Sequence, residues 1–186
     1  MQGLQNFKGR CAKVVGCDVD PEVLENPFVD EAVIIAPDGN LPFPDNTFDL
    51  IVSNWVFEHI AHPEVMAREL LRVTKPGGVI CARTPKKYGY VAIAARTISN
   101  TRHQNVLTKI QPERKSVDIF PTVYKLNTRR DLERHFGLGG DVVVSRMFSQ
   151  PAYHFNSKLL YRLFMLAHKL LPSTLGTSLH IFVTKR

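Results

Sequence analysis

The sequence contains no apolar run that approaches the length of about 20 residues needed for a membrane-spanning helix. The first six residues also lack the apolar core of a secretory signal peptide. These two absences argue against a membrane-spanning or secreted protein, and we predict a cytoplasmic location. The length of 186 residues, 44% of them hydrophobic and 22% charged, predicts one soluble domain rather than two full-sized ones.

Cysteine is scarce, and no grouping of metal ligands is visible. Cys17 and Cys81 lie in runs typical of buried strands, where a thiol behaves as a small apolar group, and the third cysteine is Cys11. We therefore expect the cysteines to be structural. The seven histidines are scattered, and none lies near a cysteine pair with zinc-ligand spacing, so no metal site is expected.

Acidic residues are few in the second half of the chain. Residues 1–85 carry 7 Lys and Arg against 12 Asp and Glu, whereas residues 86–186 carry 17 against 5. A basic half suggests an anionic partner, although a solvated basic face explains the same asymmetry. The basic residues lack regular aromatic interleaving, and no helix-turn-helix or zinc pattern is present. We therefore expect no nucleic-acid partner, despite the pI of 9.5.

Short apolar runs alternate with helix signals along most of the chain. The runs predict strands at 13–18, 32–36, 48–54, 79–82, 142–144 and 179–184. Helices are predicted after Pro21, from Pro63 to the 75–78 turn, from Asn127 or Thr128 to Phe136, and from Ser157 to Pro172. This alternation indicates an α/β fold with a mainly parallel sheet and helices on both faces.

An acid at the end of a strand is the first sign of a ligand site. Ligands of open α/β sheets bind beyond the carboxyl ends of the strands, where an acid such as Asp18 can accept both hydroxyl protons of a ribose. Nicotinamide-dependent enzymes use the same device, and many such acids only cap the next helix. The segments that follow Asp18 distinguish among these possible roles of the acid.

Three of these segments resemble class I S-adenosylmethionine-dependent methyltransferases. Residues 38–51 read DGNLPFPDNTFDLI, an acid followed by Leu-Pro-Phe and a Phe-Asp-Leu-Ile strand. Residues 53–60 (SNWVFEHI) and 71–78 (LRVTKPGG) match the end of the family's fourth strand and the turn before its fifth. Together the matching segments cover about residues 13–84, and they disfavour a nicotinamide-dependent enzyme.

The resemblance implies S-adenosyl-L-methionine as the cofactor and names residues that would hold it. In the family, the acid after the second strand binds the ribose, the acid after the third receives the adenine amino group, and the end of the fourth lies beneath the methyl group. The matching residues are Asp18 with Val19, Asp38 with Gly39, and Asn54 with Trp55. The structural alternatives are a helix cap for Asp18, an Asp-Gly turn for Asp38 and Gly39, and core packing for Trp55. No catalytic residue is assigned, because His59 fits a structural group better than a general base.

The same resemblance predicts a Rossmann-like sheet with an antiparallel last strand in a single domain, residues 1–186. Cofactor motifs occupy 13–84, an insertion near the acceptor occupies 85–126, and a helix–strand part occupies 127–186. The family's first strand and glycine-rich loop are not found, and residues 7–10 resemble the end of the helix that follows that loop. We expect a truncated methyltransferase whose central strand is missing, or a sheet that another chain completes.

The predicted reaction is methyl transfer from S-adenosylmethionine to a small-molecule acceptor with an anionic group. Side chains of the insertion would shape the acceptor pocket: Lys86, Lys87, Tyr88, Arg96, Arg102 and His103. The alternative is a truncated or degenerate methyltransferase-like protein that acts as a non-catalytic interaction module.

A membrane-surface contact is a further alternative for the helix that begins at Ser157. Its apolar stripe lies opposite three cations, Lys158, Arg162 and Lys169. Packing in the core explains the same stripe, which consists of Leu160, Leu163, Phe164, Ala167 and Leu171.

Overall fold

A computed structural model describes residues 6–89, 121–148, 157–172 and 175–186. The chain divides into two compact units, Met1–Pro44 and Asp45–Arg186, and each is described by itself. Arg96, Arg102 and His103 of the expected acceptor pocket lie outside the described residues.

The first unit is built on two short parallel strands. β1 (Val15–Asp18) pairs with β2 (Glu31–Ile34), with Val15 opposite Glu31 and Asp18 opposite Ile34. Between them lies the short 3-10 helix η2 (Pro21–Glu25), which begins with its proline and is capped by the Asp20 carboxylate. Both strands and the proline-led turn were predicted from the sequence and are confirmed.

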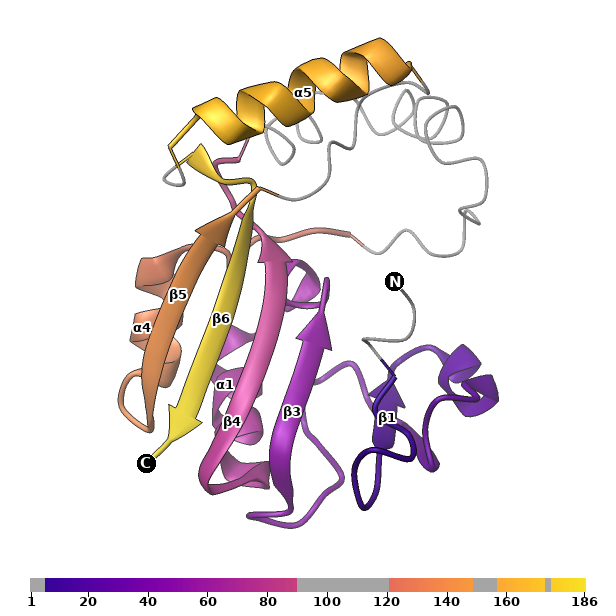
Figure 1. The fold of residues 1–186 in the computed structure, drawn as a ribbon. Helices are drawn as coiled ribbons and strands as arrows, with labels where there is room; N and C mark the ends of the chain where they lie inside the picture. The colour runs from indigo at the N-terminus through magenta and orange to yellow at the C-terminus, as the bar shows by residue number, and fades with distance from the viewer. Residues whose placement is uncertain (1–5, 90–120, 149–156, 173–174) are drawn as a thin grey trace. The chain divides into compact units, whose positions relative to one another are not determined.

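The second unit contains a four-stranded sheet in the order β3-β4-β6-β5. β4 runs parallel to β3, whereas β6 runs antiparallel to both of its neighbours, as predicted for the last strand (Figure 1). The elements follow in the order β3 (Phe48–Asn54), η3 (Phe57–His59), α1 (Pro63–Val73), β4 (Thr74–Pro85), α4 (Arg129–Phe136), β5 (Gly140–Met147), α5 (Lys158–Leu170) and β6 (Ser178–Lys185).

The core of the second unit lies between the sheet and the helices α1 and α4, which lie behind the sheet in Figure 1. Alternate residues of β4 and β6 face these helices and are buried: Ile80, Ala82, Leu179, Ile181 and Val183. Leu132 and Phe136 of α4 are fully buried, as the helix pattern predicted, and the Phe136 ring stacks on Phe57 with centroids 6.1 Å apart. Thr128 caps α4, since its hydroxyl accepts a hydrogen bond from the Asp131 N–H.

The Lys-Pro-Gly-Gly segment at residues 75–78 is not the turn between a helix and a strand that the sequence predicts. Thr74 already pairs with Phe48, and pairing resumes at Val79 opposite Leu50, so the segment bulges within β4. Gly77 has a φ of 76°, and a Cβ at Gly78 would lie 2.8 Å from the Thr74 methyl group. The bulge therefore requires both glycines.

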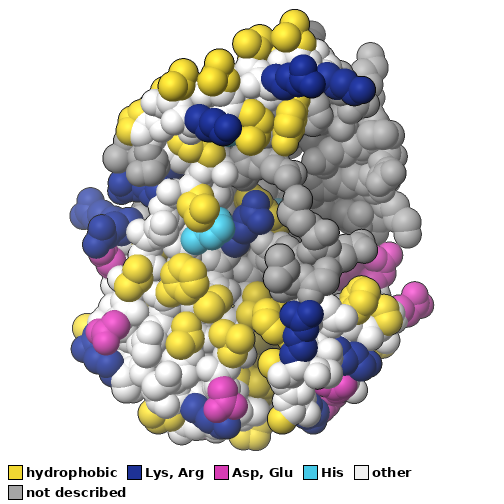
Figure 2. All heavy atoms as spheres, viewed as in Figure 1, with side chains coloured by type: hydrophobic (Ala, Val, Ile, Leu, Met, Phe, Trp, Pro, Cys, Tyr) yellow, Lys and Arg dark blue, Asp and Glu magenta, His cyan; other side chains and the backbone are white. Residues whose placement is uncertain are grey.

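The opposite face of the sheet is apolar and open to solvent in part. Val52, Cys81, Phe182 and Val143 stand side by side across the four strands, and all but Cys81 are exposed. Figure 2 shows apolar side chains gathered over this face. Among the described residues, α1 and α4 both lie on the other face.

The cysteines are not buried, contrary to the expectation from their strand patterns. Cys11 and Cys17 are exposed, and Cys81 is half-buried on the open face of the sheet. Strand periodicity cannot show whether a face is covered.

Candidate functional site

The carboxyl ends of β1 and β2 bring two of the expected cofactor residues to one edge of the first unit. Asp18 is the last residue of β1, and its carbonyl accepts a hydrogen bond of 2.9 Å from the Ile35 N–H just beyond β2. The exposed Asp18 carboxylate accepts one hydrogen bond, from the Asp20 N–H at 3.1 Å. Each carboxylate oxygen has two lone pairs, so Asp18 retains acceptors for two hydroxyl groups. Val19 follows it and is exposed.

Asp38 lies in the turn that follows β2, at the same edge. Its two oxygens accept hydrogen bonds from the Asn40 N–H (2.9 Å) and the Asn40 side-chain amide (2.8 Å). This local pattern fixes the position of the carboxylate in the turn. Gly39 is buried with a φ of 89°, which only glycine adopts easily. The Asp-Gly turn thus holds the acid in place and does not compete with a role in binding.

In the second unit, Asn54 ends β3 and Trp55 turns the chain away from the sheet. Trp55 has a φ of 59°, an unusual conformation for a bulky residue. Its N–H donates to the Arg83 carbonyl at 2.8 Å, and the Arg83 guanidinium carbon lies 4.7 Å from the indole centroid. These contacts hold a strained residue at a strand end, where strain marks sites of function more often than elsewhere.

A row of polar side chains crosses the open face of the sheet next to Trp55. Strand register places Asn54 beside Arg83, Arg83 beside His180 and His180 beside Ser145. Residues opposite each other in neighbouring strands project from the same face. In Figure 2 a histidine stands beside a basic side chain above the apolar cluster. The row therefore collects hydrogen-bond donors at the end where β3, β4 and β5 finish.

Arg83 carries a donor that the described residues do not satisfy. Its Nε atom is shielded from solvent and has no hydrogen-bond partner among the described residues. A buried donor left unpaired costs about 1–3 kcal/mol. Burial lowers the pKa of His180 below its usual value, and the Arg83 charge lowers it further. An oxyanion bound at this row would accept a hydrogen bond from the Arg83 Nε and would favour the protonated form of His180.

His59 is part of a polar network near the carboxyl end of β4. Its Nδ1 donates to the Pro121 carbonyl at 3.1 Å, and its Nε2 lies 4.0 Å from a carboxylate oxygen of the buried Glu58. Thr84 donates to Glu58 at 2.8 Å and accepts from the Asn127 amide at 2.6 Å. These contacts favour the structural role of His59 over that of a base, because the network joins β4 to the segment before α4.

The described part of the predicted insertion begins directly after β4. The Lys86 N–H donates to the Thr177 carbonyl, and the Lys87 N–H donates to the Asn127 carbonyl. Burial, and then the Arg146 charge, lower the pKa of Lys86. Tyr88 is exposed. These three residues stand near the carboxyl end of β4, the end that also carries Arg83.

Comparison with known families assigns the N-terminal part of the chain. Residues 2–82 match a family model described as a methyltransferase domain. The resemblance of the motifs in this segment to methyltransferases is thus confirmed by a match to the methyltransferase domain. An uncharacterized methyltransferase of Schizosaccharomyces pombe is 51% identical over 43 residues, which are 23% of this chain and 16% of that protein. A demethylmenaquinone methyltransferase of Symbiobacterium thermophilum is 36% identical over 88 residues, which are 41% of this chain and 34% of that protein. The chain thus spans at most about a third of these methyltransferases.

The fold of the chain is similar to that of solved methyltransferase structures. A SAM-dependent methyltransferase from Thermotoga maritima superimposes with a TM-score of 0.61 at 14% identity, covering 93% of this chain and 73% of that chain. The α/β, Rossmann-like methyltransferase fold predicted from the sequence is confirmed.

Sequence reasoning did not find Arg83 and His180. His180 lies in a predicted strand and Arg83 directly after one, where a charged residue is easily taken for a solvated one. The available signal is that Arg83 stands just before the carboxyl end of its strand, the edge at which ligands of such sheets bind.

Proposed function

We propose that the protein binds S-adenosylmethionine and transfers its methyl group to a small molecule that carries an anionic group. The match of residues 2–82 to the methyltransferase domain is the observation that carries this proposal. It is supported by the positions of Asp18, which ends β1, and Asp38, which lies in the turn after the parallel strand β2. The cofactor, when bound, supplies a methyl group on a sulfonium that a nucleophile of the acceptor can displace.

Each acid has a distinct binding role in this proposal. The Asp18 carboxylate accepts hydrogen bonds from the ribose hydroxyls, with Val19 against the adenosine. Asp38, fixed by its bonds to Asn40, accepts from the adenine amino group, and the turn at Gly39 provides backbone beside it. The resemblance assigns the reacting end of the cofactor to the strand end that carries Asn54 and Trp55.

Catalysis then rests on placement more than on proton transfer. Alignment of a nucleophile with the methyl group can supply about 7–11 kcal/mol of the barrier reduction at the extreme. A dedicated base is needed only if the acceptor must lose a proton, and His59 is held by structural contacts. This agrees with the lack of an obvious acid–base pair in the motifs.

The acceptor's anionic group binds, in our proposal, to the row formed by Arg83 and His180. A guanidinium presents paired donors that match the oxygens of a carboxylate or phosphate. The unpaired Arg83 Nε supplies one of these donors. The neighbouring Lys86, Lys87 and Tyr88 extend this anion-binding surface into the described part of the insertion.

Titration of the purified chain with S-adenosylhomocysteine tests the cofactor part of the proposal. We expect saturable binding, and incubation with methyl-labelled S-adenosylmethionine and candidate carboxylate or phosphate acceptors should yield a labelled product. No binding up to millimolar concentrations would contradict the enzyme proposal and leave the non-catalytic interaction module as the better description.

A further inference from the structure

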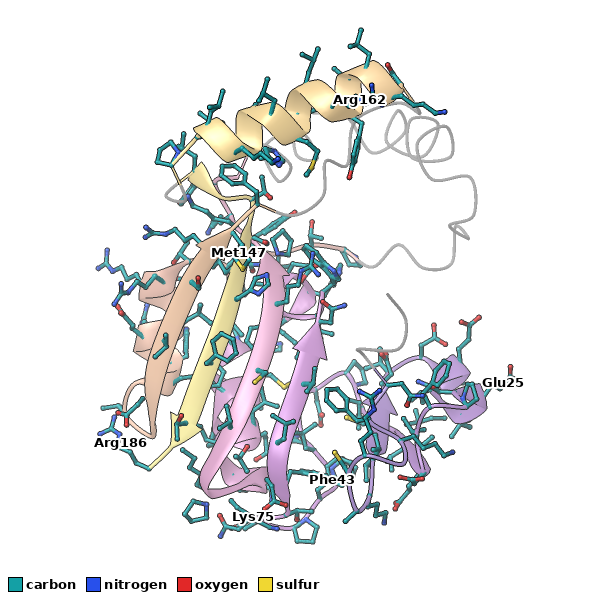
Figure 3. All side chains as sticks on the ribbon, viewed as in Figure 1. Glu25, Phe43, Lys75, Met147, Arg162 and Arg186 are labelled. Carbon is teal, nitrogen blue, oxygen red and sulfur yellow. The ribbon has the colours of Figure 1, made fainter. Side chains whose placement is uncertain are left out.

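The helix α5 sits beyond the end of the sheet at which β3, β4 and β5 finish (Figure 1). One side of the helix faces the rest of the second unit. Phe148, the residue after β5, stacks on His168 with ring centroids 4.4 Å apart, and Phe164 lies next to His168 on the same side. Figure 3 shows Met147 at the end of β5 that is nearest to α5. These aromatic contacts define the inner side of the helix.

The other side of α5 carries a stripe of exposed leucines. They recur at i, i+4, i+7 and i+11, the spacing that places side chains on one face of a helix. Leu159, Leu163, Leu166 and Leu170 are 70, 54, 54 and 76% exposed. No residue of α5 is fully buried. Of the stripe expected from the sequence, Leu160, Phe164 and Ala167 are half-buried on the inner side, so packing explains that side of the helix but not the exposed leucines. Exposed apolar stripes of this kind mark contact surfaces.

The charged side chains that follow Asp141 in the sequence are all basic. No acidic residue follows Asp141, whereas six Lys and Arg residues do, and three of them lie on α5: Lys158, Arg162 and Lys169. Helical geometry places these three cations along one border of the leucine stripe. Figure 3 labels one of them, Arg162, on the helix. Long basic side chains beside an apolar stripe can keep their charges at lipid headgroups while the stripe enters the acyl boundary.

We propose that α5 attaches the protein to the surface of an anionic membrane. The helix lies in the plane of the membrane, with its leucine stripe in the acyl boundary and its cations at the headgroups. A helix of 13 residues is too short to span a bilayer, and no helix among the described residues is long and apolar enough to do so. This orientation turns the end of the sheet that carries Trp55 and Arg83 toward the membrane.

Flotation of the full chain with lipid vesicles tests the attachment without cofactor or acceptor. We expect binding to vesicles of phosphatidylcholine with 30% phosphatidylglycerol, and much weaker binding to pure phosphatidylcholine or in 0.5 M salt. Leu163→Ser/Leu170→Ser should lower the partition coefficient by about tenfold per leucine. Lys158→Gln/Lys169→Gln should lower it by about fivefold per cation.

Matched controls separate the stripe from general surface changes. Leu138→Ser alters a leucine that is 96% exposed outside α5, and Arg68→Gln/Arg130→Gln removes two exposed cations from other helices. Both controls should float as the wild type does. Equal flotation of the α5 variants and the wild type would overturn the proposal. So would a concentration-dependent dimer that the leucine variant abolishes while neither protein binds vesicles. Because no methyl transfer is measured, these results are independent of the proposed activity.

Discussion

Replacement of Arg83 by methionine removes the proposed anchor for the acceptor. Arg83 is half-buried, its guanidinium lies 4.7 Å from the Trp55 ring centroid, and its Nε has no partner among the described residues. A hydrogen bond to a charged group contributes about 1.5–3 kcal/mol. We therefore expect Arg83→Met to weaken the binding of inorganic phosphate by about 10- to 100-fold. The phosphate affinity of Arg83→Lys should lie between those of the wild type and Arg83→Met, because lysine keeps the charge but lacks the planar pair of donors.

Trp55 provides the assay, since it is the only tryptophan in the chain. An anion that binds to Arg83 changes the environment of the stacked indole, so phosphate titration should change the intrinsic fluorescence in a saturable way. Loss of the cation–π contact, about 0.5–2 kcal/mol, should also lower the melting temperature of Arg83→Met by a few degrees.

A matched substitution distinguishes the site from the general charge of the protein. Arg68 is exposed on α1, and Arg68→Met removes the same charge away from the polar row. This variant should bind phosphate with wild-type affinity. Wild-type phosphate affinity of Arg83→Met, or an equal loss of affinity in both variants, would refute the proposed anion site.

Two further predictions concern pH and the core. Burial and the Arg83 charge lower the pKa of His180, so this histidine is neutral at pH 7, whereas a bound anion favours its protonated form. The affinity for phosphate, corrected for the titration of phosphate itself, should therefore rise as the pH falls below about 6.5. In a fluorescence titration, His180→Gln should remove this rise. Leu132→Ala should reduce the free energy of unfolding by about 2–5 kcal/mol in urea denaturation, because Leu132 is fully buried between α4 and the sheet, whereas the exposed Leu138→Ala should change it little.

The strands and helix caps could be predicted from the sequence because their causes are local. A β-branched run bounded by polar residues placed β3 at 48–54, and Thr128 with Leu132 and Phe136 placed α4. The same local reasoning failed at residues 75–78, since two glycines suit a bulge as well as a turn. Only the pairing of Thr74 with Phe48 distinguishes the two.

The polar row and the leucine stripe could not be predicted because they depend on distant segments. Arg83 and His180 are far apart in sequence, and they meet only through the antiparallel pairing of β4 with β6. In α5, apolar residues occur on both sides of the helix, so the pattern cannot show which side is covered. The contact of Phe148 with His168 identifies the inner side.

The most direct test of the account is calorimetric titration of Asp18→Asn with S-adenosylhomocysteine. The ribose hydroxyls are expected to donate to the Asp18 carboxylate, so the variant should bind about 10- to 100-fold more weakly than the wild type. Glu25→Gln, which removes another exposed carboxylate of the same unit, should bind as the wild type does. Equal affinity of Asp18→Asn and the wild type would contradict the proposed cofactor site.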